Sequence, residues 1–169
     1  MNYIITTDTH FEHEKIMDFG DRPKGFENQI LENLEKHANH NNVLIHLGDI
    51  CWKNDRTWNR ILTSMPYRKK WLLIGNHDKK SQEWYINNGW DVASQRITIT
   101  FNNKLISFSH KPTPLIAADY NIHGHFHNLP IERINEKDPE SAKIYNPETH
   151  IWLALEHHYT PFKLHNLIK

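Results

Sequence analysis

The sequence predicts an α/β fold in which two β-sheets pack face to face with helices on the outside. Two observations support this fold class. In the first half of the chain, apolar β-branched runs alternate with stretches of helical periodicity, which is typical of parallel strands joined by right-handed crossovers. In the second half, short strand-like runs follow one another with little helix between them. A βα half followed by a β-rich half favours two packed sheets covered by helices.

The first half begins with an apolar, β-branched run over 3–7, which is predicted to be a strand. Residues 26–40 carry apolar side chains at helical spacing with charges between them, so we expect an amphipathic helix there. Four further elements continue the alternation of strand and helix: a strand over 43–47, a helix over 55–65 that ends at Pro66, a strand over 71–74, and a helix over 79–88 that stops at Gly89.

The second half is predicted to be mostly strand. Asn102 and Asn103 make a natural two-residue hairpin turn between strands over 96–101 and 104–109. Residues 135–147 are rich in Lys, Asp, Glu and Pro, and we expect them to form an excursion loop. The remaining predicted strands lie at 91–93, 119–123, 151–156 and 162–167.

Composition places the chain among ordinary soluble globular proteins, and its 169 residues predict one domain over 1–169. Lys plus Arg and Asp plus Glu are balanced at 20 each, so no overall charge attracts nucleic acid or a membrane. The single cysteine, Cys51, cannot form an internal disulfide. The sequence has no secretory signal and no apolar run of membrane-spanning length. We expect a cytoplasmic protein without a membrane partner.

Five short polar clusters, each directly after a strand-like run, contain the candidate functional residues. They supply carboxylate, imidazole and amide oxygen, which is the mixture of ligands found in two-metal hydrolytic sites. Open α/β sheets form their binding crevice at the carboxyl ends of the strands, so these side chains are expected to meet there. The clusters are Asp8-Thr9-His10, Gly48-Asp49, Gly75-Asn76-His77, His110 and Gly124-His125-Phe126-His127.

Hydrolysis of a phosphate ester at neutral pH needs a nucleophile, charge neutralisation and a stabilised leaving oxygen. Two divalent ions about 3.5–4 Å apart supply all three, because they lower the pKa of a bridging water and clamp the phosphoryl oxygens. Asp49, on a tight glycine turn after a buried strand, is the natural carboxylate to bridge such a pair. Gly48, Gly75 and Gly124 are each predicted to let the backbone turn sharply, so that the next side chain faces the crevice.

The order of these clusters resembles that of the calcineurin-like metallophosphoesterases, and the resemblance covers residues 4–127. The opening Asp8-Thr9-His10-Phe11-Glu12-His13, followed by Arg22-Pro23, further resembles compact, capless members from bacteria and phages. The resemblance implies a four-layer α/β/β/α sandwich of two mixed β-sheets flanked by helices, with a binuclear metal centre. The donor mixture suits Mn, Fe, Zn or Ni, and we favour Mn.

The resemblance also implies a role for each residue of the clusters. His77 would bind no metal but would contact the phosphate and assist the leaving group, as an acid or as an electrostatic partner. Catalytic roles are therefore expected for His77, Asp49 and Asn76. One ion would be bound by Asp8, His10 and His127. The other would be bound by Asn76, His110 and His125. Asp49 would bridge the pair.

Other polar residues near the clusters are given structural roles. We expect Asp78 to be an N-cap rather than support for a ligand. His46 and His123 lie within strands, where a buried, hydrogen-bonded core histidine is favoured over a ligand. Arg22 is expected to form a structural salt bridge rather than bind phosphate. For His13, contact with substrate at the crevice rim and a plain loop position stay open.

The substrate is predicted from what the chain lacks. It has no room for a cap domain, so the crevice is expected to be open, which suits phosphodiesters and nucleotides. Trp52 is expected to pack rather than stack on a base. We therefore predict a phosphodiesterase for a nucleotide or nucleic-acid-derived phosphate ester, with a phosphomonoesterase or a non-catalytic scaffold of the same fold as alternatives. The basic residues nearest the motifs form no recognisable clamp for a monoester dianion: Arg22, Lys53, Lys79 and Lys111.

Overall fold

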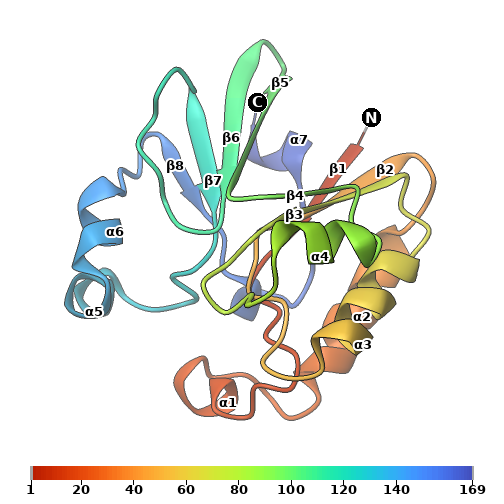
Figure 1. Cartoon of the computed structure of the whole chain (residues 1–169). Helices are drawn as coiled ribbons and strands as arrows, with labels where there is room; N and C mark the ends of the chain where they lie inside the picture. Colours follow the sequence, from red (N-terminus) through yellow and green to blue (C-terminus); the bar gives the residue numbers. More distant parts are fainter. Residues whose placement is uncertain (1, 169) are drawn as a thin grey trace.

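The computed structural model describes residues 2–168, and its strands form two mixed β-sheets (Figure 1). The first sheet has the order β4-β3-β2-β1-β9, in which β9 is antiparallel to β1 and the other pairs are parallel. The second has the order β5-β6-β7-β8, in which β5 and β6 are antiparallel. The strands are β1 Asn2–Thr6, β2 Asn42–His46, β3 Lys69–Leu73, β4 Val92–Ser94, β5 Arg96–Phe101, β6 Lys104–Ser109, β7 Tyr120–His123, β8 His150–Trp152 and β9 Phe162–Lys163.

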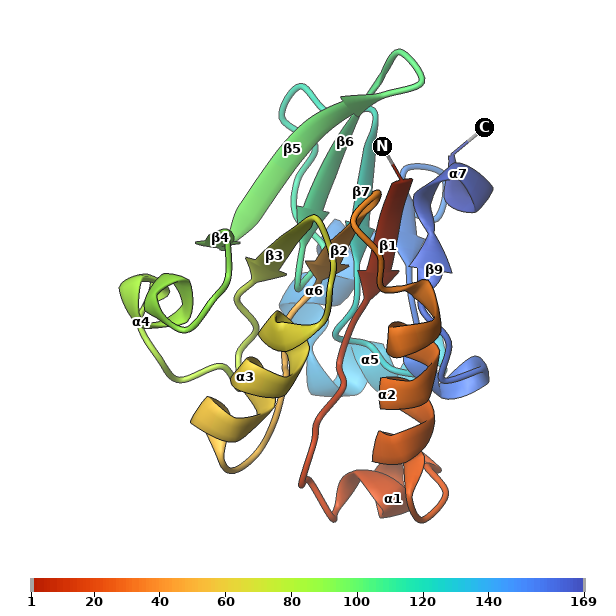
Figure 2. The same cartoon turned by 90° about the vertical axis from the view of Figure 1, so that its right-hand side faces the viewer.

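Helices flank both sheets, which gives the predicted α/β/β/α arrangement. Figures 1 and 2 show α2 and α3 side by side along the first sheet, while α5 and α6 lie next to the second sheet. Among the described residues, no helix is long and apolar enough to cross a membrane. The helices are α1 Ile16–Phe19, α2 Phe26–His37, α3 Asp55–Ser64, α4 Gln82–Asn87, α5 Ile131–Lys137, α6 Pro139–Ile144 and α7 Leu164–Leu167, with one 3-10 turn at Leu155–His157.

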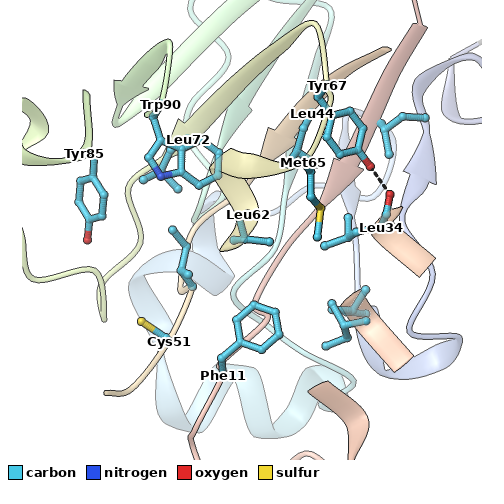
Figure 3. Close-up of a cluster of buried hydrophobic side chains, with 14 of the residues drawn as sticks. Phe11, Leu34, Leu44, Cys51, Leu62, Met65, Tyr67, Leu72, Tyr85 and Trp90 are labelled. Carbon is cyan, nitrogen blue, oxygen red and sulfur yellow. Dashed lines mark hydrogen bonds between the residues drawn. The ribbon is translucent and has the colours of Figure 1, made fainter. Parts of the chain in front are cut away.

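The helix-side core, drawn in Figure 3, packs α2 and α3 onto the first sheet. Leu34 of α2 and Leu62 of α3 meet Leu44 of β2, and all three are fully buried. The buried Tyr67 hydroxyl donates a 2.7 Å hydrogen bond to the Leu34 carbonyl, so this polar group is satisfied inside the core. Burial raises the pKa of Tyr67, which keeps the phenol protonated as the donor.

The inter-sheet core fills the space between the two sheets. Successive side chains of a strand point to opposite faces, so Leu44 faces the helices while Val43 and Ile45 face the second sheet. There they meet Phe108 of β6 and Ile122 of β7, which are also fully buried. Because each face of the first sheet is buried in a different core, a slip of one residue in a strand would exchange its two sets of side chains and disrupt both cores. This packing fixes where the carboxyl ends of the strands lie.

Most predicted elements are present with ends that differ from the prediction by a few residues at most, and the hairpin prediction is confirmed. Asn102 and Asn103 both adopt positive φ, at 48° and 60°, which is the backbone of a two-residue hairpin turn.

Three predictions for the second half are wrong. The excursion loop expected over 135–147 is largely helical, because α5 continues to Lys137 and α6 follows at once. Asp138 caps α6 by accepting a 3.2 Å hydrogen bond from the Ser141 N–H, and Pro139 is compatible with the first helical turn. The strand predicted over 151–156 ends at Trp152 and gives way to the 3-10 turn. The strand predicted over 162–167 has two residues and then becomes α7.

Candidate metal centre

All five polar clusters meet at the carboxyl ends of β1, β2, β3, β6 and β7. Backbone hydrogen bonds hold the loops together, since Asp8 N donates to Gly48 O at 3.0 Å and His10 N donates to Asp49 O at 3.0 Å. On the second sheet, Gly124 N donates to His110 O at 3.1 Å. Side chains that are more than a hundred residues apart in the sequence are thereby brought into one cluster.

The first group of candidate ligands is Asp8, His10 and His127, all of which are buried. Nε2 of His10 lies 3.9 Å from Oδ1 of Asp8, and Nε2 of His127 lies 4.0 Å from the same oxygen. Oδ1 of Asp8 and Nε2 of His10 are buried without a hydrogen-bond partner among the described residues. Buried polar atoms are nearly always satisfied, so two unpaired atoms that lie 3.9 Å apart fit ligands of a shared cation.

The second group combines Asp49, His110 and His125, with Asn76 beside them. Oδ1 of Asn76 lies 2.8 Å from Nε2 of His110, and Nδ1 of His125 lies 3.2 Å from that same nitrogen. Nδ1 of His110 faces the Leu47 carbonyl at 2.9 Å. That contact favours the tautomer in which Nδ1 carries the proton and Nε2 offers its lone pair to the cluster.

Asp49 lies between the two groups. Its Oδ2 is 3.5 Å from Nε2 of His10 and 3.4 Å from Nε2 of His110. Metal–ligand bonds of about 2.0–2.2 Å put neighbouring donors of one ion roughly 3–4 Å apart, so these separations fit ligands of a shared cation. Burial raises the pKa of Asp49 to about 6, and the nearby carboxylates of Asp8 and Asp78 act in the same direction. The donor set and its spacing therefore fit two divalent ions bridged by Asp49.

The backbone at this cluster is unusual. Five of the seven candidate ligands have positive φ: Asp8 at 47°, His10 at 48°, Asp49 at 56°, His125 at 70° and His127 at 52°. Left-handed backbone costs a residue with a side chain about 1 kcal/mol or more, and it persists only where the surroundings enforce it. Such strain gathered in one cluster is typical of a functional site.

The sequence predicted one shared role for the three motif glycines, but the structure gives them different roles. Gly48 has φ of 98° and makes the predicted sharp turn. Gly75 and Gly124 do not have positive φ, so that prediction is wrong for them. A Cβ on Gly75 would overlap the Asp49 carboxylate, and one on Gly124 would overlap the Asp8 carboxylate. These two glycines leave the space in which the carboxylates lie.

Asp78 is not the N-cap that the sequence predicted, because Ser81 caps α4. The buried Asp78 carboxylate accepts hydrogen bonds from the N–H groups of Asp49 at 2.8 Å, Ile50 at 3.0 Å and Gly75 at 2.8 Å. It thus ties the loop after β2 to the loop after β3. This contact holds the backbone on which Asp49 stands.

Glu156, which the sequence did not single out, supports the first group. Its Oε1 lies 2.8 Å from Nδ1 of His127 and accepts a 2.6 Å hydrogen bond from Nη2 of Arg22. Arg22 also donates to the backbone carbonyls of Asp8 at 2.6 Å and Thr9 at 2.9 Å. The prediction of a structural salt bridge for Arg22 is confirmed, and this bridge leads directly to a candidate ligand.

Asp138, which lies in the segment expected to be a loop, supports the second group. Its Oδ2 lies 2.9 Å from Nε2 of His125 and 2.7 Å from Nζ of Lys111. A carboxylate on the outer nitrogen of a histidine fixes the ring and raises its basicity toward a metal. Hydrogen bonds from Lys111 and Ser141 outweigh partial burial and hold the pKa of Asp138 below its usual range.

His46 and His123 are core histidines, as predicted. His46 contacts the Thr9 hydroxyl at 3.0 Å with Nε2 and accepts the Gly48 N–H at 3.1 Å with Nδ1. Burial lowers the pKa of each histidine to about 3, so both are neutral at pH 7. His46 additionally links the loop after β1 to the loop after β2.

His77 faces the cluster from the loop after β3. Its Nε2 lies 3.9 Å from Oδ2 of Asp49, and its backbone N–H donates to Oδ1 of Asp49 at 2.8 Å. Next to it, Trp52 stacks on His13 with ring centres 4.3 Å apart and planes 6° from parallel. Trp52 is 50% exposed, so it packs less completely than predicted. His13 is buried and lines the hollow beside His77.

The cluster opens into a hollow of about 380 Å³. Its lining includes Asp49, Asn76 and His77, together with Lys111 and Asp138. Three of the four candidate histidine ligands also line it: His10, His125 and His127. The apolar side of the wall comes from Leu129 and from Ile134 of α5, so the helices that replaced the expected loop shape this hollow.

A model of the calcineurin-like phosphoesterase family matches residues 1–167, and the chain therefore belongs to this family. The crystal structure of AQ665, a protein of unknown function from Aquifex aeolicus, is similar with a TM-score of 0.76 and 27% identity over 98% of this chain and 97% of that one. An archaeal phosphodiesterase shares the fold with a TM-score of 0.53 and 15% identity over 91% of this chain and 84% of its own. Curated protein sequences give no significant match.

Proposed function

We propose that this protein is a phosphodiesterase that uses two divalent metal ions. The observation that carries the proposal is the position of Asp49, whose Oδ2 lies 3.5 Å from His10 and 3.4 Å from His110. One carboxylate oxygen thus contacts a candidate ligand from each of two groups. Membership of the calcineurin-like phosphoesterase family supports hydrolysis of a phosphate ester at this place.

Each side chain of the cluster has a proposed role. When bound, the ions would neutralise the phosphoryl charge and lower the pKa of a water molecule. Manganese is our preferred ion, although imidazole with carboxylate suits Fe, Zn and Ni as well. The proposed ligands are Asp8, His10 and His127 for one ion, Asn76, His110 and His125 for the other, and Asp49 for both.

His77 is the proposed catalytic residue that binds no metal. It lines the hollow beside Asp49, where it can contact a phosphoryl or leaving-group oxygen. Burial together with Lys79 and His110 lowers the pKa of His77, so its neutral form predominates at pH 7 before substrate binds. An anionic phosphate next to the ring raises the pKa again and favours the protonated donor that the leaving oxygen needs.

Preference for a diester rests on two of the cations closest to the candidate ligands. Arg22 is buried against Glu156, and Lys111 pairs with Asp138 at 2.7 Å. Neither is available as a fixed clamp for the second charge of a monoester. Trp52, half exposed beside His77 with ring centres 5.1 Å apart, offers a surface for a nucleobase, which supports a nucleotide-derived substrate.

The test compares kcat/KM for bis-p-nitrophenyl phosphate and p-nitrophenyl phosphate at one manganese concentration. We expect the diester to be preferred and the activity to disappear in Asp49→Ala, which also loses bound manganese. Asp18→Ala, an exposed change on α1, is the matched control and should keep full activity. A preference for the monoester would make the protein a phosphomonoesterase. Two bound ions without hydrolysis of either compound would make it a non-catalytic scaffold.

A further inference from the structure

A second hollow of about 470 Å³ adjoins the cluster of candidate ligands. It shares Asn76 and His110 with the cluster, and Gln95, Arg96 and Lys111 complete its polar wall. Anything bound in this hollow therefore lies next to a group held by the metal centre.

The strand pairing explains why a cation stands here. Arg96 begins β5 and pairs with Ser109, the last residue of β6, so it lies next to His110 and Lys111 as they leave the sheet. Ile74 N donates to Ser94 O at 2.8 Å, which brings the end of β4 against the loop that carries Asn76. The hollow thus lies where the chain passes from β4 of the first sheet to β5 of the second.

Both charged side chains that line this hollow are cationic. None of its lining residues is Asp or Glu, whereas Arg96 and Lys111 are both present. Lys111 is engaged by Asp138, but no carboxylate oxygen within residues 2–168 lies within 4.0 Å of the Arg96 guanidinium. Nη2 of Arg96 donates a 3.0 Å hydrogen bond to the Pro114 carbonyl. This bond anchors the guanidinium and leaves its other N–H donors for a ligand. An anchored guanidinium in a hollow without carboxylates suits a phosphate group, because its planar N–H donors can bond two phosphate oxygens at once.

We propose that this hollow binds a second phosphate group of the substrate, while the scissile phosphate lies on the metal centre. The inference rests on the proposed function and narrows it to substrates with at least two phosphates joined by a short linker, such as an oligonucleotide. Arg96 is the residue that recognises the second phosphate. Because it is separated from the metals by Asn76 and His110, it contributes to selection of the substrate and not to the chemical step.

A pair of non-hydrolysable probes tests this subsite without relying on catalysis. Propane-1,3-diyl bisphosphonate carries two anionic groups, and propylphosphonate carries one. Titration calorimetry on the manganese-loaded protein should give at least about tenfold tighter binding of the bisphosphonate, the amount that charge-assisted hydrogen bonds contribute. In Arg96→Gln this advantage should fall to about twofold or less. Arg96→Lys, which keeps the charge without the planar fork, should retain part of it.

Arg68→Gln is the matched control, because Arg68 is exposed before the amino-terminal end of β3 and should leave the advantage unchanged. Equal binding of both probes by the unaltered protein, or no binding of the bisphosphonate, would overturn the subsite. So would an Arg96→Gln variant that weakens both probes equally, since Arg96 would then serve the central phosphate. Hydrolysis of bis-p-nitrophenyl phosphate, measured separately, reports on the proposed function alone. If the protein hydrolyses this diester but does not prefer the bisphosphonate, the subsite is wrong and the proposed function stands.

Discussion

His77 and Asp49 are neighbours with different proposed tasks, although both face the same hollow. Asp49 contacts both groups of candidate ligands. His77 lies at the edge of the cluster: its Nε2 is 3.9 Å from Asp49, its backbone N–H is 2.8 Å from Asp49, and its ring centre is 5.5 Å from that of His10. The side chain of His77 is 33% exposed and that of Asp49 is 2% exposed. The exposed ring can meet substrate, while the buried carboxylate can hold metal.

Replacing His77 by alanine should separate the two tasks. We expect His77→Ala to keep two manganese ions, because the proposed ligands and the backbone N–H to Asp49 are retained. Turnover should fall by roughly 10²–10⁴-fold, the range for loss of a group that assists charge or proton transfer. Elemental analysis and kcat on the diester measure both effects. His40→Ala, an exposed change after α2, serves as the control. Loss of the metals in His77→Ala would show that this division of roles is wrong.

The raised pKa of Asp49 predicts how pH governs metal binding. Without metal, burial holds this pKa near 6, above its unfolded value of 3.8. The stability contributed by protonated Asp49 is therefore present below pH 3.8 and is lost as pH rises through about 6. Manganese binds the ionised form, so it competes with the proton at pH 5.5 and not at pH 7.5. The increase in melting temperature on adding manganese should be larger at pH 7.5. An equal increase at both pH values would contradict the assignment of Asp49 as a ligand.

At the scale of the elements, the α5–α6 pair contributes side chains both to a candidate ligand and to the hollow. It places Asp138 on the outer nitrogen of His125 and Ile134 in the wall of the hollow. The sequence contained a signal for α6, because Asp138, Pro139 and Ser141 form the pattern of a capped helix start. The dense charges over 135–147 concealed it.

Asp138→Asn tests whether α6 supports a metal ligand. Asparagine remains a good N-cap, so the helix should be retained while the carboxylate on His125 is lost. We expect the weaker of two manganese-binding steps to lose about 10–100-fold in affinity, the usual effect of removing such a partner. Calorimetric titration resolves the two steps. Glu140→Gln, exposed on the same helix, should leave both unchanged. Equal weakening of both steps would point to a general disturbance of the fold.

Tyr67 tests the helix-side core independently of the metals. Its hydroxyl donates to the carbonyl of Leu34, which lies in the last turn of α2, where helix carbonyls commonly need a partner from outside the helix. Tyr67→Phe should lower the free energy of unfolding by about 1 kcal/mol, because a buried acceptor is left unpaired. Urea unfolding measures this loss, and diesterase activity should be unaffected. An unchanged free energy would mean that water replaces the hydroxyl.

At the scale of the whole molecule, the fold was predictable because strand–helix alternation and apolar runs are local patterns. That the seven candidate residues would lie close together was predictable, because each belongs to a loop that follows a strand. Glu156 and Asp138 were not, since nothing in the sequence near a lone carboxylate tells which histidine it will meet 29 or 13 residues away. The roles of Gly75 and Gly124 were missed for the same reason, because the carboxylates that need their space come from other strands.

The central claim is that one cluster at the edge of two sheets holds two ions. Anomalous diffraction at the manganese absorption edge, on crystals grown with excess manganese, tests it most directly. The account predicts two peaks about 3.5–4 Å apart, both within bonding distance of Asp49, with three further side chains around each. A single peak, or none, with Asp8, His10 and His110 turned away from one another would contradict it.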